Sequence, residues 1–113
     1  MTEIWHNPRC SKSRQTLALL QERGIEPAVR LYLDDAPDEA ALRRVAGLLG
    51  VTAVGMMRTK EALFKELGLG KDMSDDALFA AMAAHPKLIE RPVVLHGGKA
   101  AMGRPPEAVV EIL

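Results

Sequence analysis

Hydrophobic and polar positions alternate with two different periods in the first part of the chain, and each period predicts an element. Residues 2–6, TEIWH, look like a short strand that is bounded by the turn-prone pair Asn7-Pro8. From residue 11 to 23 the sequence places Leu17 and Leu20 on one helical face, and Gly24 follows as a stop signal. We therefore expect a strand, a short loop and a helix.

A second strand is predicted over residues 26–33. Here Val29, Leu31 and Leu33 recur at every second position, so they share one face of an extended chain. A strand, a helix and another strand in this order favour a parallel pair of strands with a right-handed crossover.

The middle of the chain carries helical patterns only. The apolar spacing predicts helices over about 37–49, 53–57, 60–67 and 75–84, and Ser74 is placed to cap the last of them.

The last part of the chain returns to strands. Residues 92–95 and 99–102 flank the turn pair Gly97-Gly98, which predicts a hairpin, and a final helix is expected to begin near Pro105-Pro106. The whole order is β-α-β, a helical insertion, then β-β-α. This is the element order of a thioredoxin-like α/β fold with an all-helical subdomain inserted.

Length and composition fit one domain over residues 1–113. A chain of 113 residues with 48% apolar residues can bury a single core. We expect the thioredoxin-like core to cover about 1–35 and 87–113, with the helical insertion over about 36–86.

Net charge and the absence of targeting patterns bear on which partners and which compartment we expect. Fifteen basic and fifteen acidic residues give a formal net charge of zero, so no overall field favours nucleic acid or an anionic membrane. The N-terminus lacks the pattern of a signal peptide, and no apolar run is long enough for a membrane span. We expect a cytoplasmic monomer that binds neither nucleic acid nor membrane.

Cys10 is the only cysteine, and it directly precedes the first predicted helix. Backbone N–H groups and the positive end of the helix dipole favour a thiolate there, and Arg9, Lys12 and Arg14 add positive charge. The same N–H groups can hold a tetrahedral anion above the sulfur. The alternative is a buried cysteine that acts as a small apolar residue.

The spacing around Cys10 excludes two familiar anion loops and fits a third pattern. A phosphatase loop needs an arginine where Thr16 stands, and no nucleotide P-loop sequence occurs. Cys10 and Ser13 instead form Cys-x-x-Ser, a redox position without its second sulfur. A single cysteine cannot form an intrachain disulfide, so an external thiol has to complete any redox cycle.

Three arginines outside this loop are candidate anion ligands. Arg58, Arg91 and Arg104 interrupt apolar or turn segments, and guanidinium groups donate paired hydrogen bonds to oxyanions. The alternative is that each is an ordinary surface arginine. In thioredoxin-like folds a cis-proline faces the active cysteine, so we predict a cis Arg91–Pro92 bond and Arg91 beside Cys10.

No metal site is predicted. His85 and His96 have no second ligand at metal-binding spacing.

Over essentially its whole length the chain resembles the glutaredoxin-dependent arsenate reductase (ArsC-like) family. The segments that carry the resemblance are HNPRCSKSR, MMRTKE, KELGL, HPKLIERPVV and GRPPEAVVEIL. The resemblance implies that Cys10 attacks arsenate, that Arg58, Arg91 and Arg104 bind the oxyanion, and that His6 helps to keep Cys10 ionised. We expect Ser13, Arg14 and Pro92 to be supporting residues.

The resemblance also implies the reaction cycle. A thiol–arsenate adduct forms on Cys10, glutathione attacks, arsenite leaves, and glutaredoxin removes the glutathione that remains on Cys10. Glutathione is then a co-substrate, and no cofactor is tightly bound. This chain departs from the well-studied reductases of the family in two places. Those proteins carry a longer C-terminal tail, and they have a small uncharged pair where this chain has Ser11-Lys12.

Two alternatives stay open. One is a regulatory binding protein like the Spx-type proteins, which contact RNA polymerase and usually carry Cys-x-x-Cys, a pattern that Ser13 breaks here. The other is a thiol oxidoreductase that acts on another oxyanion or on a glutathionylated protein.

Overall fold

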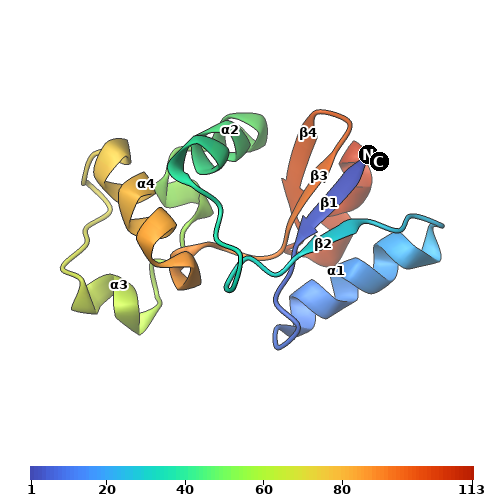
Figure 1. The fold of residues 1–113 in the computed structure, drawn as a ribbon, viewed down its shortest axis with the longest axis horizontal. Helices are drawn as coiled ribbons and strands as arrows, with labels where there is room; N and C mark the ends of the chain where they lie inside the picture. Colours follow the sequence, from blue (N-terminus) through green and yellow to red (C-terminus); the bar gives the residue numbers. More distant parts are fainter. The chain divides into compact units, whose positions relative to one another are not determined.

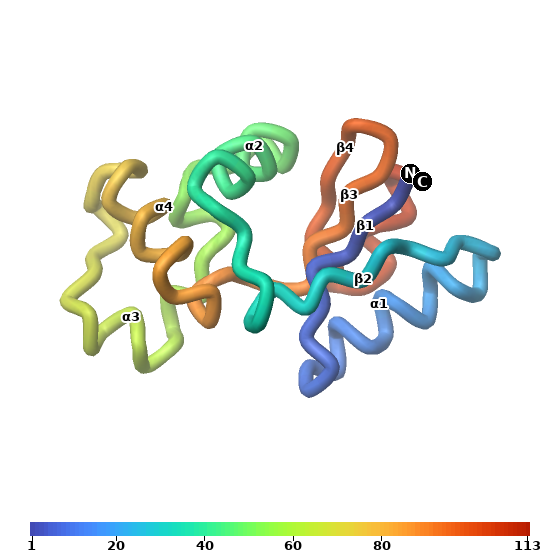
Figure 2. The backbone as a smooth tube through the Cα atoms, viewed as in Figure 1, coloured from blue at the N-terminus to red at the C-terminus, as the bar shows by residue number.

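The computed structural model describes residues 1–113 and divides into two compact units. The first unit comprises Met1–Asp35 and Arg91–Leu113, and the second comprises Ala36–Glu90. Figure 2 traces the backbone out of the first unit after β2 and back into it before β3. The first unit is therefore built from two separate stretches of chain, whereas the second is continuous.

A four-stranded sheet organises the first unit (Figure 1). Its strands are β1 (Thr2–Trp5), β2 (Ala28–Arg30), β3 (Val93–His96) and β4 (Lys99–Met102), in the order β2-β1-β3-β4. β1 runs parallel to β2 and antiparallel to β3, and β3 runs antiparallel to β4. The β3–β4 turn is made by Gly97 and Gly98, both with positive φ, as a tight hairpin requires.

One hydrophobic cluster of this unit lies on one face of the sheet. Ile4, Val94 and Ala101 are register partners across three strands, so their side chains share that face. They pack with Leu20 of α1 (Ser11–Glu22) and Val109 of the 3₁₀ helix η3 (Pro106–Ile112). This cluster fixes α1 against the sheet, and with it the residue that begins α1.

The predicted second strand is wrong in its length and in its buried face. β2 has only three residues, and Val29, Leu31 and Leu33 are 48%, 42% and 44% exposed. β2 is an edge strand whose partner β1 ends at Trp5, opposite Arg30. Beyond it the Leu31 carbonyl accepts the N–H groups of Asp34 and Asp35, so the backbone turns.

The remaining predictions for this unit are confirmed with small shifts. The first strand, the first helix and the hairpin lie where the pattern placed them. The last helix begins at Pro106, and it is a 3₁₀ helix, with Ala108 N–H donating to the Pro105 carbonyl.

The second unit is helical. It contains α2 (Glu39–Leu49), η1 (Val54–Met56), α3 (Ala62–Glu66), α4 (Asp75–Ala84) and η2 (Pro86–Leu88), of which only η2 was not predicted. Asp38 caps α2 by accepting from Ala41 N–H, and Ser74 caps α4 as expected. No helix of either unit is both long and apolar enough to cross a membrane.

Candidate active site

Cys10 is the N-cap residue of α1, as the sequence predicts. Its N–H donates to the Asn7 carbonyl, and its carbonyl accepts from Arg14 N–H, which is the first bond of the helix. The cysteine is buried, and the backbone N–H groups of Lys12 and Ser13 in the first turn of the helix are directed at its side chain. The sulfur is held by backbone geometry at the positive end of α1.

The surroundings of Cys10 favour its thiolate. Burial alone raises the pKa of the thiol, but three groups act the other way and the net shift is downward. In order of size they are the Ser13 N–H, the charge and hydrogen bond of Arg91, and the Lys12 N–H. Backbone donors and one guanidinium therefore outweigh desolvation.

Ser13 ties the end of β1 to the first turn of α1. Its buried hydroxyl lies 2.6 Å from Nδ1 of His6 and accepts from Asn7 N–H at 3.0 Å. Burial, followed by the charge of Arg14, lowers the pKa of His6, so its imidazole is neutral near pH 7. His6 therefore supports the cysteine loop through Ser13 as a neutral hydrogen-bonding group.

Arg14 closes the same loop from outside. Its Nη1 donates to the Pro8 carbonyl at 2.8 Å, while Arg9 N–H donates to the Asn7 side chain at 3.0 Å. These bonds fix the loop that carries Cys10.

Arg91 lies beside Cys10, and the Arg91–Pro92 bond is cis, as the sequence analysis predicts. Arg104 Nη1 donates to the Arg91 carbonyl at 3.0 Å, and the Arg104–Pro105 bond is also cis, which was not predicted. The structure thus brings two of the three candidate arginines to one place, with Cys10.

Gly103 and Thr16 hold this place together, and the sequence analysis missed both in this role. Gly103 N–H donates to the Pro92 carbonyl at 3.0 Å, and a Cβ at Gly103 would lie 2.7 Å from Pro92 Cγ and overlap the Thr16 side chain. Thr16 is fully buried on α1. The glycine allows α1 to approach the start of β3, and a single glycine directly after a predicted strand gave no signal of that contact.

Arg58 belongs to the second unit, where it is described by its own neighbours. Its Nη1 lies 2.8 Å from Oε2 of Glu61, and Lys87 Nζ lies 3.3 Å from the other oxygen of Glu61. Glu61 was not a candidate in the sequence analysis, although its spacing of three residues from Arg58 allows such a pair on one turn.

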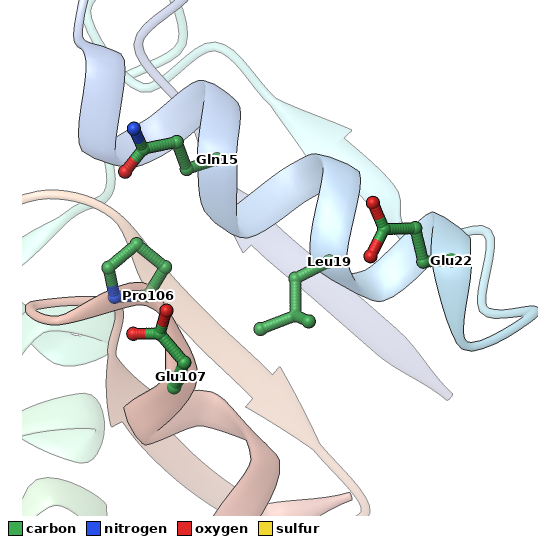
Figure 3. A pocket seen from close by; sticks show the side chains of 5 residues that line it. All are labelled: Gln15, Leu19, Glu22, Pro106 and Glu107. Carbon is green, nitrogen blue, oxygen red and sulfur yellow. The ribbon is translucent and has the colours of Figure 1, made fainter.

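A groove of about 320 Å³ lies between α1 and η3 (Figure 3). It is lined by Gln15, Leu19 and Glu22 from α1 and by Pro106 and Glu107 from η3. None of the candidate residues lines it. Its two carboxylates make it a poor place for an oxyanion.

His85 and His96, for which the sequence predicts no metal site, lie in different units and have different neighbours. His96 Nδ1 lies 2.6 Å from the Thr2 hydroxyl across β1 and β3, and His85 ends α4. The structure holds no group of three or more His, Cys, Asp or Glu side chains that could bind a metal ion.

Comparisons with known proteins agree with this geometry. The ArsC family model matches residues 5–112. An arsenate reductase of Neisseria meningitidis is 53% identical over 98% of this chain and 97% of its own, and the uncharacterized protein YfgD of Escherichia coli is 54% identical over 98% and 95%. The solved structure of an arsenate reductase from Vibrio cholerae is 57% identical, with a TM-score of 0.96 over 99% of this chain and 97% of its own, which confirms the thioredoxin-like fold. The chain belongs to the ArsC family.

Proposed function

We propose that this protein reduces arsenate to arsenite, with Cys10 as the nucleophile. The observation that carries the proposal is the pair of Cys10 and Arg91: a thiol with a lowered pKa at a helix N-terminus, hydrogen-bonded to a guanidinium. A thiolate is the reactive form, and a guanidinium binds tetrahedral oxyanions. The relatives named arsenate reductases support arsenate as the oxyanion.

The chemistry needs two thiols. The Cys10 thiolate bonds to arsenic, and one arsenate hydroxyl leaves as water after taking up a proton. A glutathione thiolate then attacks the Cys10 sulfur, the S–As bond breaks, and its electron pair stays on arsenic, which leaves as arsenite. Two sulfurs are oxidised to one disulfide while As(V) is reduced to As(III).

We assign the arginines to the oxyanion. Arg91 is the contact nearest to the sulfur, because its guanidinium already faces Cys10. Arg104, which donates to the Arg91 carbonyl, and Arg58 of the second unit complete the proposed set. Fixed positive groups stabilise the charge that builds on the oxyanion during the displacement.

His6, Ser13, Arg14 and Pro92 are proposed as supporting residues. The His6–Ser13 contact and the bond from Arg14 to the Pro8 carbonyl hold the loop in which the Cys10 sulfur meets the N–H groups of α1. Preorganised donors lower the barrier because they do not have to reorient during the reaction.

Glutathione and glutaredoxin are proposed as the reductants. Ser13 takes the place of a second cysteine and its hydroxyl is already bonded to His6, so the second thiol must come from another molecule. Glutaredoxin then releases Cys10 by attacking the mixed disulfide with glutathione. We further propose a monomer without a tightly bound cofactor, working in a reducing cytoplasm.

A coupled assay tests both the proposed substrate, arsenate, and the proposed reductants, glutathione and glutaredoxin. Purified protein is incubated with arsenate, glutathione, glutaredoxin, glutathione reductase and NADPH, and arsenite is measured directly beside Cys10→Ser and the control Arg44→Gln, an exposed arginine of α2. We expect arsenite from the wild type and from the control only. Arsenite no higher than with Cys10→Ser refutes the proposed substrate.

Three further measurements separate the alternatives. Turnover with thioredoxin and thioredoxin reductase, but not with glutathione and glutaredoxin, replaces the proposed reductant and leaves arsenate in place. Cys10-dependent release of glutathione from a glutathionylated protein, without arsenate turnover, favours a thiol oxidoreductase. A stable RNA polymerase complex without any turnover favours a regulatory protein.

A further inference from the structure

Three side chains of the second unit form a connected ion cluster around Glu61. Oε2 of Glu61 lies 2.8 Å from Arg58 Nη1, and Oε1 lies 3.3 Å from Lys87 Nζ. Each carboxylate oxygen therefore has its own cation. The cluster carries a net charge of one positive unit, since two cations surround one anion.

Glu61 is the most sheltered member of this cluster. Its side chain is 14% exposed, compared with 27% for Arg58 and 63% for Lys87. A carboxylate that is this covered, with a cation on each oxygen, holds a defined position better than an exposed pair does. The central member of the cluster is thus its fixed point.

The backbone holds the two ends of the Arg58–Glu61 pair in place. Arg58 N–H donates to the Leu88 carbonyl at 2.8 Å, and Glu61 N–H donates to the Arg58 carbonyl at 3.1 Å. The side-chain pair therefore closes a turn that is already ordered. Little conformational entropy remains to be lost when the ion pair forms.

The contact with Glu61 uses one nitrogen of the Arg58 guanidinium. Nη1 faces the carboxylate, and the paired donors of Nε and Nη2 lie along a different edge of the planar group. That edge can donate two parallel hydrogen bonds to a tetrahedral oxyanion. Glu61 can therefore bind Arg58 through Nη1 while Nε and Nη2 bind a ligand.

We propose that Glu61 is a positioning residue of the oxyanion site, which holds the Arg58 guanidinium, and that Lys87 balances the charge of Glu61. The inference rests on the proposed function, because it takes Arg58 as an arsenate ligand. Without Lys87, Glu61 would neutralise Arg58 and the pair would attract an anion less strongly. With Lys87 the pair keeps its net positive charge.

The sign of one measurement separates positioning from simple charge. Removing the carboxylate makes the cluster more positive, so charge alone predicts a lower KM for arsenate in Glu61→Ala. Loss of positioning predicts the opposite, a KM raised about tenfold with kcat within about twofold of the wild type. Glu61→Gln keeps an acceptor but loses the charge-assisted bond, so its KM should lie between, at about threefold.

The experiment measures arsenate KM and kcat in the coupled assay, together with protection of Cys10 by arsenate against alkylation and the Tm of each variant. Matched controls are Glu66→Ala and Lys65→Met, two exposed residues of α3. We expect Lys87→Met to raise KM about threefold through lost attraction. A merely structural cluster would lower Tm and leave KM and protection unchanged.

The outcomes are distinct. A raised KM in Glu61→Ala, with Glu61→Gln between it and the wild type, supports the inference. An active wild type with an unchanged or lower KM in Glu61→Ala, or a Glu61→Gln value outside that interval, overturns it alone. A wild type without arsenate turnover and without arsenate protection of Cys10 overturns the proposed function, and the inference with it.

Discussion

The contact of Gly103 with α1 and Pro92 makes Gly103→Ala a sharp test of how the site is held together. The new Cβ would lie 2.7 Å from Pro92 Cγ and 3.0 Å from Thr16 Cγ2, and it would overlap the Thr16 hydroxyl. Neither neighbour can rotate away easily. Pro92 is a buried ring, and the buried Thr16 hydroxyl donates to the Lys12 carbonyl at 2.8 Å.

The size of the effect follows from these distances. Carbon atoms pack best at about 3.5 to 4.0 Å, so α1 and the start of β3 must separate by roughly 1 Å to admit the methyl group. Overpacking of this kind costs about 1 to 3 kcal/mol of unfolding free energy. For a chain of this length that corresponds to a Tm lower by roughly 4 to 12 °C.

The same displacement should reach the thiol. Moving α1 away from Pro92 also moves Cys10 away from Arg91, whose charge and hydrogen bond lower the pKa of the thiol. We therefore expect the midpoint of the pH dependence of Cys10 alkylation to rise in Gly103→Ala.

Thermal unfolding followed by circular dichroism, with denaturant titration beside it, measures the loss of stability. Gly47→Ala is the matched control, because Gly47 lies in α2 with nothing within 4 Å of the added Cβ. There the substitution should stabilise by about 0.5 to 1 kcal/mol. If Gly103→Ala unfolds at the wild-type temperature or above it, the close contact of Gly103 with Pro92 and Thr16 does not limit the stability of the fold, and the prediction is wrong.

Four further predictions concern Arg91, the Cys10 thiol, Ser13 and the cap of α2. Arg91→Gln should shift the alkylation midpoint of Cys10 to higher pH, because Arg91 lowers the pKa of that thiol, whereas an unchanged midpoint would contradict the assignment. The pKa of Cys10 in the folded state lies below its ordinary value. The thiolate should therefore stabilise the fold above the unfolded-state pKa, and this stabilisation should be lost as the pH falls through the folded-state pKa. Urea unfolding of the wild type and of Cys10→Ser, compared across pH, checks this. Ser13→Ala should lower the unfolding free energy by about 1 to 3 kcal/mol, because the buried His6 ring and the part-buried Asn7 N–H lose their partner, and an unchanged free energy in denaturant titration would contradict this. Asp38→Ala should cost about 1 kcal/mol through loss of the α2 cap, with Asp38→Asn restoring most of the Tm.

The local signals in the sequence were sufficient where one residue type has one strong conformational preference. The pair Gly97-Gly98 specified the hairpin turn, and Ser74 specified the start of α4. The position of Cys10 at the first turn of α1 followed from the end of one period and the start of the next. In each case the cause lies within a few residues of the effect.

Prediction from the sequence failed where the conformation or role of a residue depends on another residue far away along the chain. Leu31 and Leu33 have the alternation of a half-buried strand, but β2 is an edge strand and stops where its partner stops. The role of Gly103 depends on Thr16, and the role of Glu61 depends on Lys87. Periodicity carries no information about such distant pairs.

The order of the strands has a consequence for synthesis on the ribosome. β1 lies at the centre of the sheet, and it pairs with β3 from Thr2 opposite His96 to Trp5 opposite Val93. The second unit, Ala36–Glu90, is continuous and can complete its contacts before β3 has been made. β1 has one edge without its partner for most of translation, and pairings this distant in sequence form slowly. A pause or truncation before residue 93 therefore leaves an unprotected central strand, which is where we expect nascent chains of this protein to recruit chaperones.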